Sequence, residues 1–313
     1  MQRPGSERDI ATAAKGKLAR IKGLGVAGVL RGLGAGMTAG SLDLIRKPKI
    51  YGRTGSLEVR LATTRAEVKL AQRLRYQVFF EEMSAVPSRL AQFRRRDEDV
   101  YDAVCDHLLV VDLSLSNGPA RKGLTASPKV VGTYRVLRQD VAQKHNGFYT
   151  AGEYDISSLL ARHSERHRFM ELGRSCVLAP YRTKRTVELL WQGLWAYVRE
   201  HSVDVMLGCA SFEGTDPDQH AMALSFLHHN AMAPDQWRAR AHDNLYVSMA
   251  RLPKDQINAK AALKEMPPLI KGYLRLGAYV GDGAVIDHQF GTTDVLIVLP
   301  VENIDPRYFD YFS

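Results

Sequence analysis

The sequence predicts a mixed α/β fold. Strand-like and helix-like segments alternate between residues 57 and 300, two of the strands are joined as a hairpin, and the strand–helix units do not repeat regularly. The chain has 313 residues, of which 45% are hydrophobic and 25% are charged, so it can bury a substantial core.

The predicted domain begins with a strand and a capped helix. Residues 57–61 alternate between apolar and charged side chains, as a half-buried strand requires. Thr64 and Glu67 have the spacing of a capping box, and apolar residues then recur at helical spacing as far as Val78. A polar loop over residues 84–106 is expected to follow.

The central part predicts a hairpin and then a β-α-β crossover. Two strands, at residues 107–112 and 130–137, flank a turn region over residues 114–128. A further strand at 169–178 runs into a basic turn. The helix after this turn has one apolar face, which includes Val187, Leu190, Trp191, Leu194 and Val198.

The last third predicts one more helix and three strands. A strand over residues 203–212 precedes Asp216 and Pro217, which supply an N-cap and a first-turn proline for a helix to about residue 229. The pair Pro267–Pro268 is interpreted as a break. Two further strands are expected at residues 273–280 and 294–299.

The net charge of +9 is unevenly distributed. Residues 1–50 contain ten lysines and arginines against three acidic residues, which leaves the remainder nearly neutral. We therefore predict a basic arm, residues 1–50, attached to a nearly neutral domain, residues 51–313, and anionic membranes or nucleic acid are the usual partners of such arms. Repeated glycines leave an interfacial helix and a disordered leader equally open, and they argue against a secretory signal.

Several classes of protein are disfavoured. No run of about 18 apolar residues predicts a membrane span. The cysteines Cys105, Cys176 and Cys209 match neither a zinc site nor a disulfide framework, so we expect core residues in a reducing, cytoplasmic setting. The histidines form no HExxH cluster, so no metal is expected. The sequence contains no dinucleotide, P-loop or serine-hydrolase motif.

One segment combines residue types that suit chemistry on an anionic substrate. From Glu171 to Arg185 a carboxylate and a glycine on a strand precede a basic turn at a helix entrance. The free N–H groups of a helix N-terminus bind anions, and Arg182 and Lys184 would strengthen that binding. The competing interpretation is a solvated charged turn after a core strand.

This strand, turn and helix resemble the pantetheine-pyrophosphate site of the GCN5-related N-acetyltransferase (GNAT) superfamily. Four motifs more closely resemble the autoinducer (acyl-homoserine lactone) synthases. The segments RYQVFFEEM, ELGRSCVLAPYR and the C-terminal PPLIKGYLRLGAYVGDGAVIDHQFGTTDVLIVLP are still more similar to bacterial L-ornithine N-alpha-acyltransferases. The resemblance covers about residues 57–300, and its four motifs are Arg75-Tyr-Gln-Val-Phe79, Asp99-Val-Tyr-Asp102, Gly132-Thr-Tyr-Arg135 and Glu171-Leu-Gly-Arg174.

The resemblance implies a central mixed sheet flanked by helices and a specific reaction. A 3-hydroxyacyl chain would pass from acyl carrier protein to the α-amine of L-ornithine and give lyso-ornithine lipid. The amine would attack the thioester directly, without an acyl-enzyme. The donor arm would be the 4′-phosphopantetheine of the carrier, with no permanently bound cofactor. The enzyme would be cytoplasmic and would bind the inner face of the cytoplasmic membrane through residues 1–50.

The resemblance also implies roles for individual residues. Ornithine carries a carboxylate and two ammonium groups, so arginines and carboxylates should line its pocket. For Asp99 and Asp102, the competing interpretation is a charged face that is exposed to solvent. The donor arm is expected at the turn and helix entrance. The substrate-binding candidates are Arg75, Phe79, Asp99, Asp102 and Arg135, and the donor-binding candidates are Tyr181, Arg182, Thr183, Lys184 and Arg185.

The catalytic candidates are Glu171, Gly173 and Arg174. Glu171 is the expected base for the ammonium, and its competing role is an ion pair with Arg174 or Arg135. Strict alternation would place Glu171 and Arg174 on opposite faces of the strand. A bulge at Gly173 would bring both to the site and would expose an N–H that polarises the thioester.

Two departures from the superfamily pattern and two alternatives complete the prediction. The turn after Arg182 lacks the small residues of the acetyl-CoA loop, which favours carrier protein over free CoA. Residues 216–230 contain no tyrosine that could serve as the general acid. The first alternative is an autoinducer synthase that uses S-adenosylmethionine. The second is a nucleic-acid-binding protein, but the folded part is nearly neutral, so no nucleic acid is expected.

Overall fold

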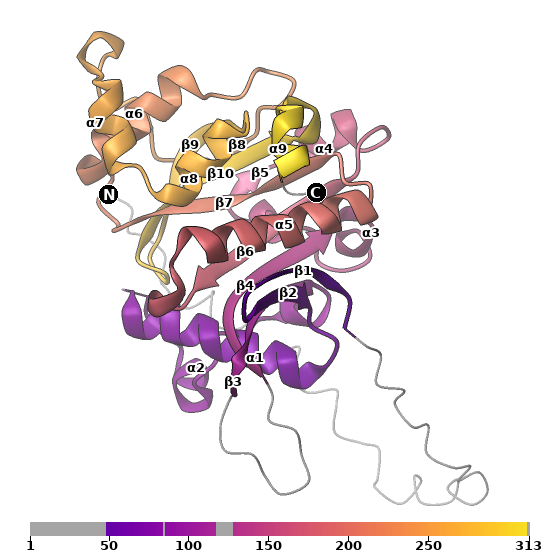
Figure 1. The fold of residues 1–313 in the computed structure, drawn as a ribbon. Helices are drawn as coiled ribbons and strands as arrows, with labels where there is room; N and C mark the ends of the chain where they lie inside the picture. Colours follow the sequence, from indigo (N-terminus) through magenta and orange to yellow (C-terminus); the bar gives the residue numbers. More distant parts are fainter. Residues whose placement is uncertain (1–47, 84, 117–127, 312–313) are drawn as a thin grey trace, which may run out of the picture. The chain divides into compact units, whose positions relative to one another are not determined.

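A ten-stranded sheet forms the frame of the fold (Figure 1). The computed structural model describes residues 48–83, 85–116 and 128–311, so the predicted basic arm lies outside the described residues except for its last three. The strands lie in the order β1-β2-β3-β4-β6-β7-β10-β9-β8-β5. Their bounds are β1 Ile50–Thr54, β2 Leu57–Leu61, β3 Asp106–Ser116, β4 Pro128–Arg138, β5 Tyr154–Asp155, β6 Phe169–Val177, β7 Val205–Glu213, β8 Arg240–Ala241, β9 Tyr279–Asp287 and β10 Thr292–Pro300.

The strand pairing confirms the mixed α/β prediction. β1 to β4 form an antiparallel series, β4 pairs antiparallel with β6, and the central pair β6–β7 is parallel. The connection between β6 and β7 is α5 (Lys184–Glu200), as the predicted crossover requires. The predicted hairpin strands are β3 and β4.

Helix α1 (Arg65–Tyr76) starts where the sequence predicts. The Thr64 side chain accepts a hydrogen bond from Glu67 N at 3.2 Å, and the Glu67 carboxylate accepts one from Thr63 N at 2.8 Å. The reciprocal bond therefore reaches one residue further back than in a standard capping box. A π-helical turn, Gln77–Glu82, continues the helix.

The two faces of the sheet carry different side chains. Leu137 of β4 pairs with Glu171 of β6, and Glu171 pairs with Leu207 of β7. Neighbouring paired residues share a face, so these side chains lie together, with Arg135 two residues before Leu137. On the opposite face α5 packs closely against β2, because a Cβ at Gly193 would lie 2.5 Å from Val59 Cγ2.

The predicted strand at residues 273–280 is wrong over residues 273–278. Residues Pro268–Arg275 form α8, and β9 begins only at Tyr279. Pro268 is the first residue of this helix, where the fixed φ of proline favours a helix start. The Tyr273 hydroxyl lies 2.7 Å from that of Tyr134, so this segment packs against the sheet as a helix.

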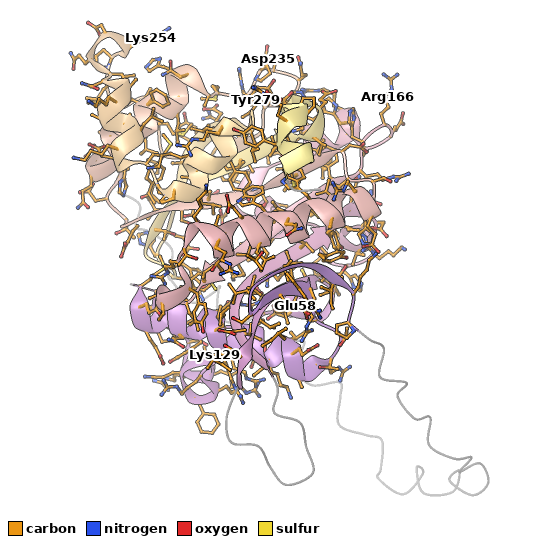
Figure 2. The ribbon with its side chains drawn as sticks, in the orientation of Figure 1. Glu58, Lys129, Arg166, Asp235, Lys254 and Tyr279 are labelled. Carbon is orange, nitrogen blue, oxygen red and sulfur yellow. The ribbon has the colours of Figure 1, made fainter. Side chains whose placement is uncertain are left out.

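The remaining helices are short and lie around the sheet (Figure 1). Asp216 caps a 3₁₀ turn, Pro217–His220, which leads into α6, so the predicted helix has two parts. Exposed charged side chains such as Arg166, Asp235 and Lys254 point away from the sheet (Figure 2). No helix in the described part of the chain is long and apolar enough to cross a membrane. The other helices are α2 Arg89–Arg94, α3 Gln139–Ala142, α4 Ser157–His163, α6 Ala221–Asn230, α7 Ala259–Glu265 and α9 Pro306–Tyr311.

Candidate active site

A buried network of arginines and aspartates joins α1, the following loop and β4. Arg75 is fully buried, and its Nη1 and Nη2 each donate to one oxygen of Asp102 at 2.8 Å. Its Nε donates to Asp97 at 2.8 Å. Arg135 Nη1 donates to both oxygens of Asp99 at 2.7 Å and lies 3.2 Å from Asp102 Oδ1. The structure thus brings the four charged substrate-binding candidates together.

The short 3₁₀ helix Val100–Ala103 positions two of these carboxylates. Asp99 caps it by accepting from Tyr101 N at 2.9 Å, and the Asp102 side chain accepts from Asp99 N at 3.2 Å. Burial alone would raise the pKa of Asp102, but the hydrogen bonds and charge of Arg75 hold it well below its usual range. Asp102 is therefore a buried ion-pair partner, and the interpretation as a solvated face is wrong for it.

Arg174 occupies the bulge of β6. Gly173 pairs with Arg135 and Cys176 with Thr133, so Arg174 and Ser175 together oppose one residue of β4. Arg174 has a φ of 52°, and this left-handed backbone turns its side chain. The extra residue is thus Arg174, one position after the predicted Gly173.

The guanidinium of Arg174 lies among aromatic and acidic groups. It is 5.0 Å from the ring centre of Tyr149 and 4.5 Å from that of Phe290. Its Nε is 3.3 Å from Asp97 Oδ2. The ring of Phe79 meets Phe290 edge-on at 5.7 Å, so this substrate-binding candidate also borders the network.

Glu171 holds a neighbouring turn in place. Its two oxygens accept hydrogen bonds from Tyr149 N at 2.9 Å and Thr150 N at 2.6 Å, at the start of the turn Tyr149–Gly152. Burial raises the pKa of Glu171, although these bonds oppose the shift. Among the described residues no ion pair joins Glu171 to Arg174 or Arg135, and its hydrogen-bond partners belong to Tyr149 and Thr150.

The strands β6 and β7 separate beside this network. In the described strands they form three ladder pairs, of which the last joins Glu171 and Leu207. A Cβ on Gly208 would lie 2.2 Å from Leu172 O, so only glycine permits the close approach at the separation point. Beyond it β7 continues to pair with β10. The backbone of β6 from Gly173 onward therefore has no ladder partner on its β7 side.

The donor-binding candidates surround the start of α5. Thr183 is the N-cap and accepts from Thr186 N at 3.3 Å. Arg182 donates to Val177 O at 2.9 Å and pairs with Glu82. The Tyr181 hydroxyl donates to Asp112. The side chains of Lys184 and Arg185 are exposed.

Cysteine chemistry has no support at this site. Cys176 lies on β6 and is 7% exposed, and burial raises the pKa of its thiol. Burial also raises the pKa of Cys105, to about 12. A thiol is nucleophilic as a thiolate, so neither side chain is a nucleophile. Cys176 is a core residue, as predicted, whereas Cys105 is partly buried and packs against the core.

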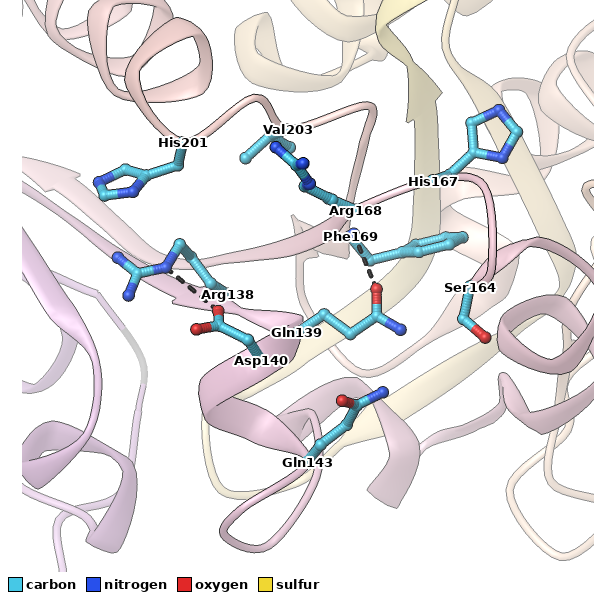
Figure 3. A pocket seen from close by; sticks show the side chains of 10 residues that line it. All are labelled: Arg138, Gln139, Asp140, Gln143, Ser164, His167, Arg168, Phe169, His201 and Val203. Atoms are coloured by element: carbon cyan, nitrogen blue, oxygen red, sulfur yellow. Dashed lines mark hydrogen bonds and ion pairs between the residues drawn. The ribbon is translucent and has the colours of Figure 1, made fainter.

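A pocket of about 430 Å³ opens at the other end of β6 (Figure 3). Gln139 accepts from Phe169 N there at 3.0 Å, and Arg138 pairs with Asp140. None of the predicted site residues lines this pocket. Its lining consists of Arg138, Gln139, Asp140, Gln143, Ser164, His167, Arg168, Phe169, His201 and Val203.

Sequence reasoning missed several residues that lie in the network or beside it. Tyr149, Thr150 and Phe290 lie in segments for which no element was predicted. Asp97 stands in the RRRDED run, where its charge has no distinguishing pattern. Asp294 carried a usable signal, because it is a single carboxylate at the start of an apolar strand.

Comparisons with known proteins place the chain in a family. Residues 74–192 match the family described as acetyltransferase (GNAT) domain. A protein of Agrobacterium fabrum named L-ornithine N(alpha)-acyltransferase is 55% identical over 264 residues, which cover 84% of this chain and 87% of that protein. A protein of the same name from Rhizobium meliloti is 56% identical, over 84% of this chain and 86% of that protein. Another from Rhodobacter capsulatus is 37% identical, over 82% of this chain and 95% of that protein.

Solved structures with a similar chain path have much lower identity. An N-acyl amino acid synthase from uncultured soil microbes is 10% identical, with a TM-score of 0.43 over 82% of this chain and 92% of that one. An AHL synthase is 12% identical, with a TM-score of 0.39 over 77% and 89%. Because its sequence is more than half identical to the relatives from Agrobacterium fabrum and Rhizobium meliloti over most of its length, the chain belongs to the L-ornithine N(alpha)-acyltransferase family and is an acyltransferase with a GNAT-like fold.

Proposed function

We propose that the chain transfers a 3-hydroxyacyl group from the 4′-phosphopantetheine thioester of acyl carrier protein to the α-amine of L-ornithine and so makes lyso-ornithine lipid. The observation that carries the proposal is the convergence of Arg135, Glu171 and Arg174 at the point where β6 leaves β7. The names of the relatives supply the amine substrate.

The unpaired backbone of β6 suits a pantetheine donor. A pantetheine arm is extended and carries amide groups, so it can hydrogen-bond to a strand edge as an added strand does. The exposed Lys184 and Arg185 stand at the end of this edge, because Val177 of β6 accepts a hydrogen bond from the neighbouring Arg182. Their charge complements an acidic carrier protein.

The reaction requires no covalent enzyme intermediate. The α-ammonium loses a proton, the free amine attacks the thioester carbonyl carbon, the C–S bond breaks, and the leaving pantetheine thiolate takes up a proton. Glu171 accepts the first proton, directly or through a water molecule. A backbone N–H at the Arg174 bulge, where β6 no longer pairs with β7, stabilises the oxyanion. The buried Cys176 takes no part.

The proposed place of the reaction is the inner face of the cytoplasmic membrane. The product is an amphiphile, and residues 1–50 carry most of the net positive charge of the chain. Basic segments are attracted to the anionic lipids of this surface. The arm would therefore keep the enzyme where its product is used.

The test is product analysis with the full chain. Incubation with 3-hydroxyacyl carrier protein and L-ornithine should give an N-acyl-ornithine of the mass of lyso-ornithine lipid. Parallel reactions replace the carrier thioester by the matching acyl-CoA, or ornithine by S-adenosylmethionine. An acyl-homoserine lactone from S-adenosylmethionine, or turnover with acyl-CoA as efficient as with the carrier, would contradict the proposal.

A further inference from the structure

Three carboxylates outside the arginine–aspartate network converge near Arg174. One oxygen each of Glu153, Asp287 and Asp294 lie within 4.8 Å of one another. Asp294 is 6% exposed, and its Oδ1 has no hydrogen-bond partner among the described residues. The buried Oε2 of Glu153 also has none among those residues. Buried acceptors without a donor are rare and costly, so the cluster indicates a cationic ligand.

Three different elements build this carboxylate cluster. Glu153 directly follows the turn Tyr149–Gly152, which Glu171 holds through two backbone N–H groups. Asp287 ends β9, and its Oδ1 accepts from the backbone N–H groups of Gln289 at 2.7 Å and Phe290 at 2.8 Å. Asp294 lies on the adjacent strand β10. The fold therefore sets the backbone positions of all three residues, and its hydrogen bonds also hold the side chain of Asp287.

The charges of the cluster are incompletely balanced in the described structure. Burial and the charge of Asp294 raise the pKa of Glu153 to about 7. Burial also raises the pKa of Asp294 to about 6, although the Ser211 and Thr292 hydroxyls lie beside it. Arg174 opposes both shifts, but its guanidinium also serves the aspartates of the network. An additional positive charge would relieve the repulsion.

We propose that Glu153, Asp287 and Asp294 bind the side-chain ammonium group of a diamino-acid substrate. The inference rests on the proposed function and adds a recognition site for the amine that does not react. An ammonium group has three N–H donors, which match three carboxylates.

The position of the cluster beside the network supports this ligand. The Phe290 ring contacts Arg174, and the backbone N–H of Phe290 donates to Asp287. The trimethylene chain of ornithine would therefore run from the α-amine near β6 to the cluster. A divalent cation could also use three carboxylates, but the direct attack that we propose does not require one.

The test compares L-ornithine with L-norvaline, which has the same skeleton without the side-chain amine. With the full chain and 3-hydroxyacyl carrier protein, the kcat/KM ratio should favour ornithine by about 100-fold or more, because norvaline leaves buried carboxylates unpaired. Asp294→Asn and Glu153→Gln should reduce this ratio to below about 10-fold, mainly through the KM for ornithine. The matched control Asp235→Asn, whose side chain is 93% exposed, should keep the full ratio.

Calorimetry without the acyl donor separates this proposal from the proposed function. Binding of ornithine, weak binding of norvaline, and loss of the difference in Asp294→Asn would support the pocket even if no turnover were seen. An unchanged preference in folded Asp294→Asn and Glu153→Gln would overturn the pocket while leaving the acyltransfer intact. Binding of Mg²⁺ or Ca²⁺ that Asp294→Asn abolishes, with loss of the ornithine preference in EDTA, would make the cluster a metal site and would also overturn it.

Discussion

At the scale of single residues, the site depends on which buried charges have partners. Arg75 and Asp102 satisfy each other through two bonds of 2.8 Å, so they stabilise the framework and leave little charge for a substrate. Glu171 differs, because its hydrogen bonds come from neutral groups of Tyr149 and Thr150 and a carboxylate has further lone pairs for a proton. The proton acceptor is therefore expected at Glu171 and the structural ion pair at Arg75–Asp102.

We expect Glu171→Gln to lower kcat by about 10²-fold or more, because the amide cannot accept a proton from the ammonium group. Part of the activity should return as pH rises, since more of the amine is then already neutral. The measurement is a pH profile of kcat with ornithine. If Glu171 only holds the turn at Tyr149, the KM for ornithine should rise instead and the profile should keep its wild-type shape.

We expect Asp102→Asn to lower the free energy of unfolding by about 3–5 kcal/mol at neutral pH, because it leaves the buried Arg75 without its main counter-charge. Denaturant unfolding measures this difference. The folded pKa of Asp102 is lowered, so its stabilisation is complete above the unfolded pKa, about 3.9, and is lost as pH falls through the folded pKa. The gap between wild type and variant should therefore narrow below about pH 4.

The matched control for this prediction is Asp235→Asn, which makes the same change at the surface. Asp235 pairs with Arg238, and the side chain of Asp235 is 93% exposed. Exposed pairs of this kind contribute about 0–1 kcal/mol. A loss as small in Asp102→Asn as in Asp235→Asn would show that the buried pair does not stabilise the fold.

At the scale of elements, the separation of β6 from β7 and the start of α5 form one unit. Gly208 permits the close approach to Leu172, after which β6 has an open edge that leads to α5. Thr183 caps the helix, and the exposed Lys184 and Arg185 follow in its first turn. The same short segment thus offers backbone groups for an extended ligand and positive charge for an acidic protein.

We expect the double reversal Lys184→Glu and Arg185→Glu to raise the KM for acyl carrier protein at least about 10-fold while the KM for ornithine changes little. Charges at the rim of an interface act mainly on the association rate, so the effect should diminish at high salt. The control carries the same change on α7, as Lys260→Glu and Lys264→Glu, where both side chains are exposed. Equal effects of the two double variants would place the docking surface elsewhere.

At the scale of the whole molecule, the net positive charge and the proposed catalytic residues lie in different parts of the chain. The network and the carboxylate cluster belong to residues 75–294, whereas residues 1–50 carry most of the net positive charge. In the described residues β1 begins at Ile50, and the Lys49 ammonium lies 2.6 Å from the Glu200 carboxylate. A truncation that spares the body should therefore end at residue 47.

We expect deletion of residues 1–47 to reduce co-sedimentation with vesicles that contain anionic lipids. Each basic residue near such a surface contributes about 1 kcal/mol of attraction. Turnover with soluble acyl carrier protein and ornithine should remain close to wild type, which shows that the truncated chain is folded. Equal sedimentation of both chains at low salt would contradict a membrane role for the arm.

The amino-acid sequence by itself determined the local elements and much of the site. Capping at Thr64, alternation in β2 and the apolar face of α5 are short-range patterns, so they could be recognised directly. The arginines and carboxylates of four motifs pointed to an acyltransferase through their resemblance to known families. The structure brings them together, with Arg75, Asp102 and Arg135 in direct contact.

Only the tertiary structure decided how distant segments meet. Asp97, Phe290 and Asp294 acquire a role because strand order and chain folding bring residues 77 to 141 positions apart within a few ångströms, and no local pattern encodes that. Packing also selected helix for α8, where Tyr273 meets Tyr134, and placed the β6 bulge at Arg174. Local propensity is a weak preference, and burial and pairing with distant partners override it.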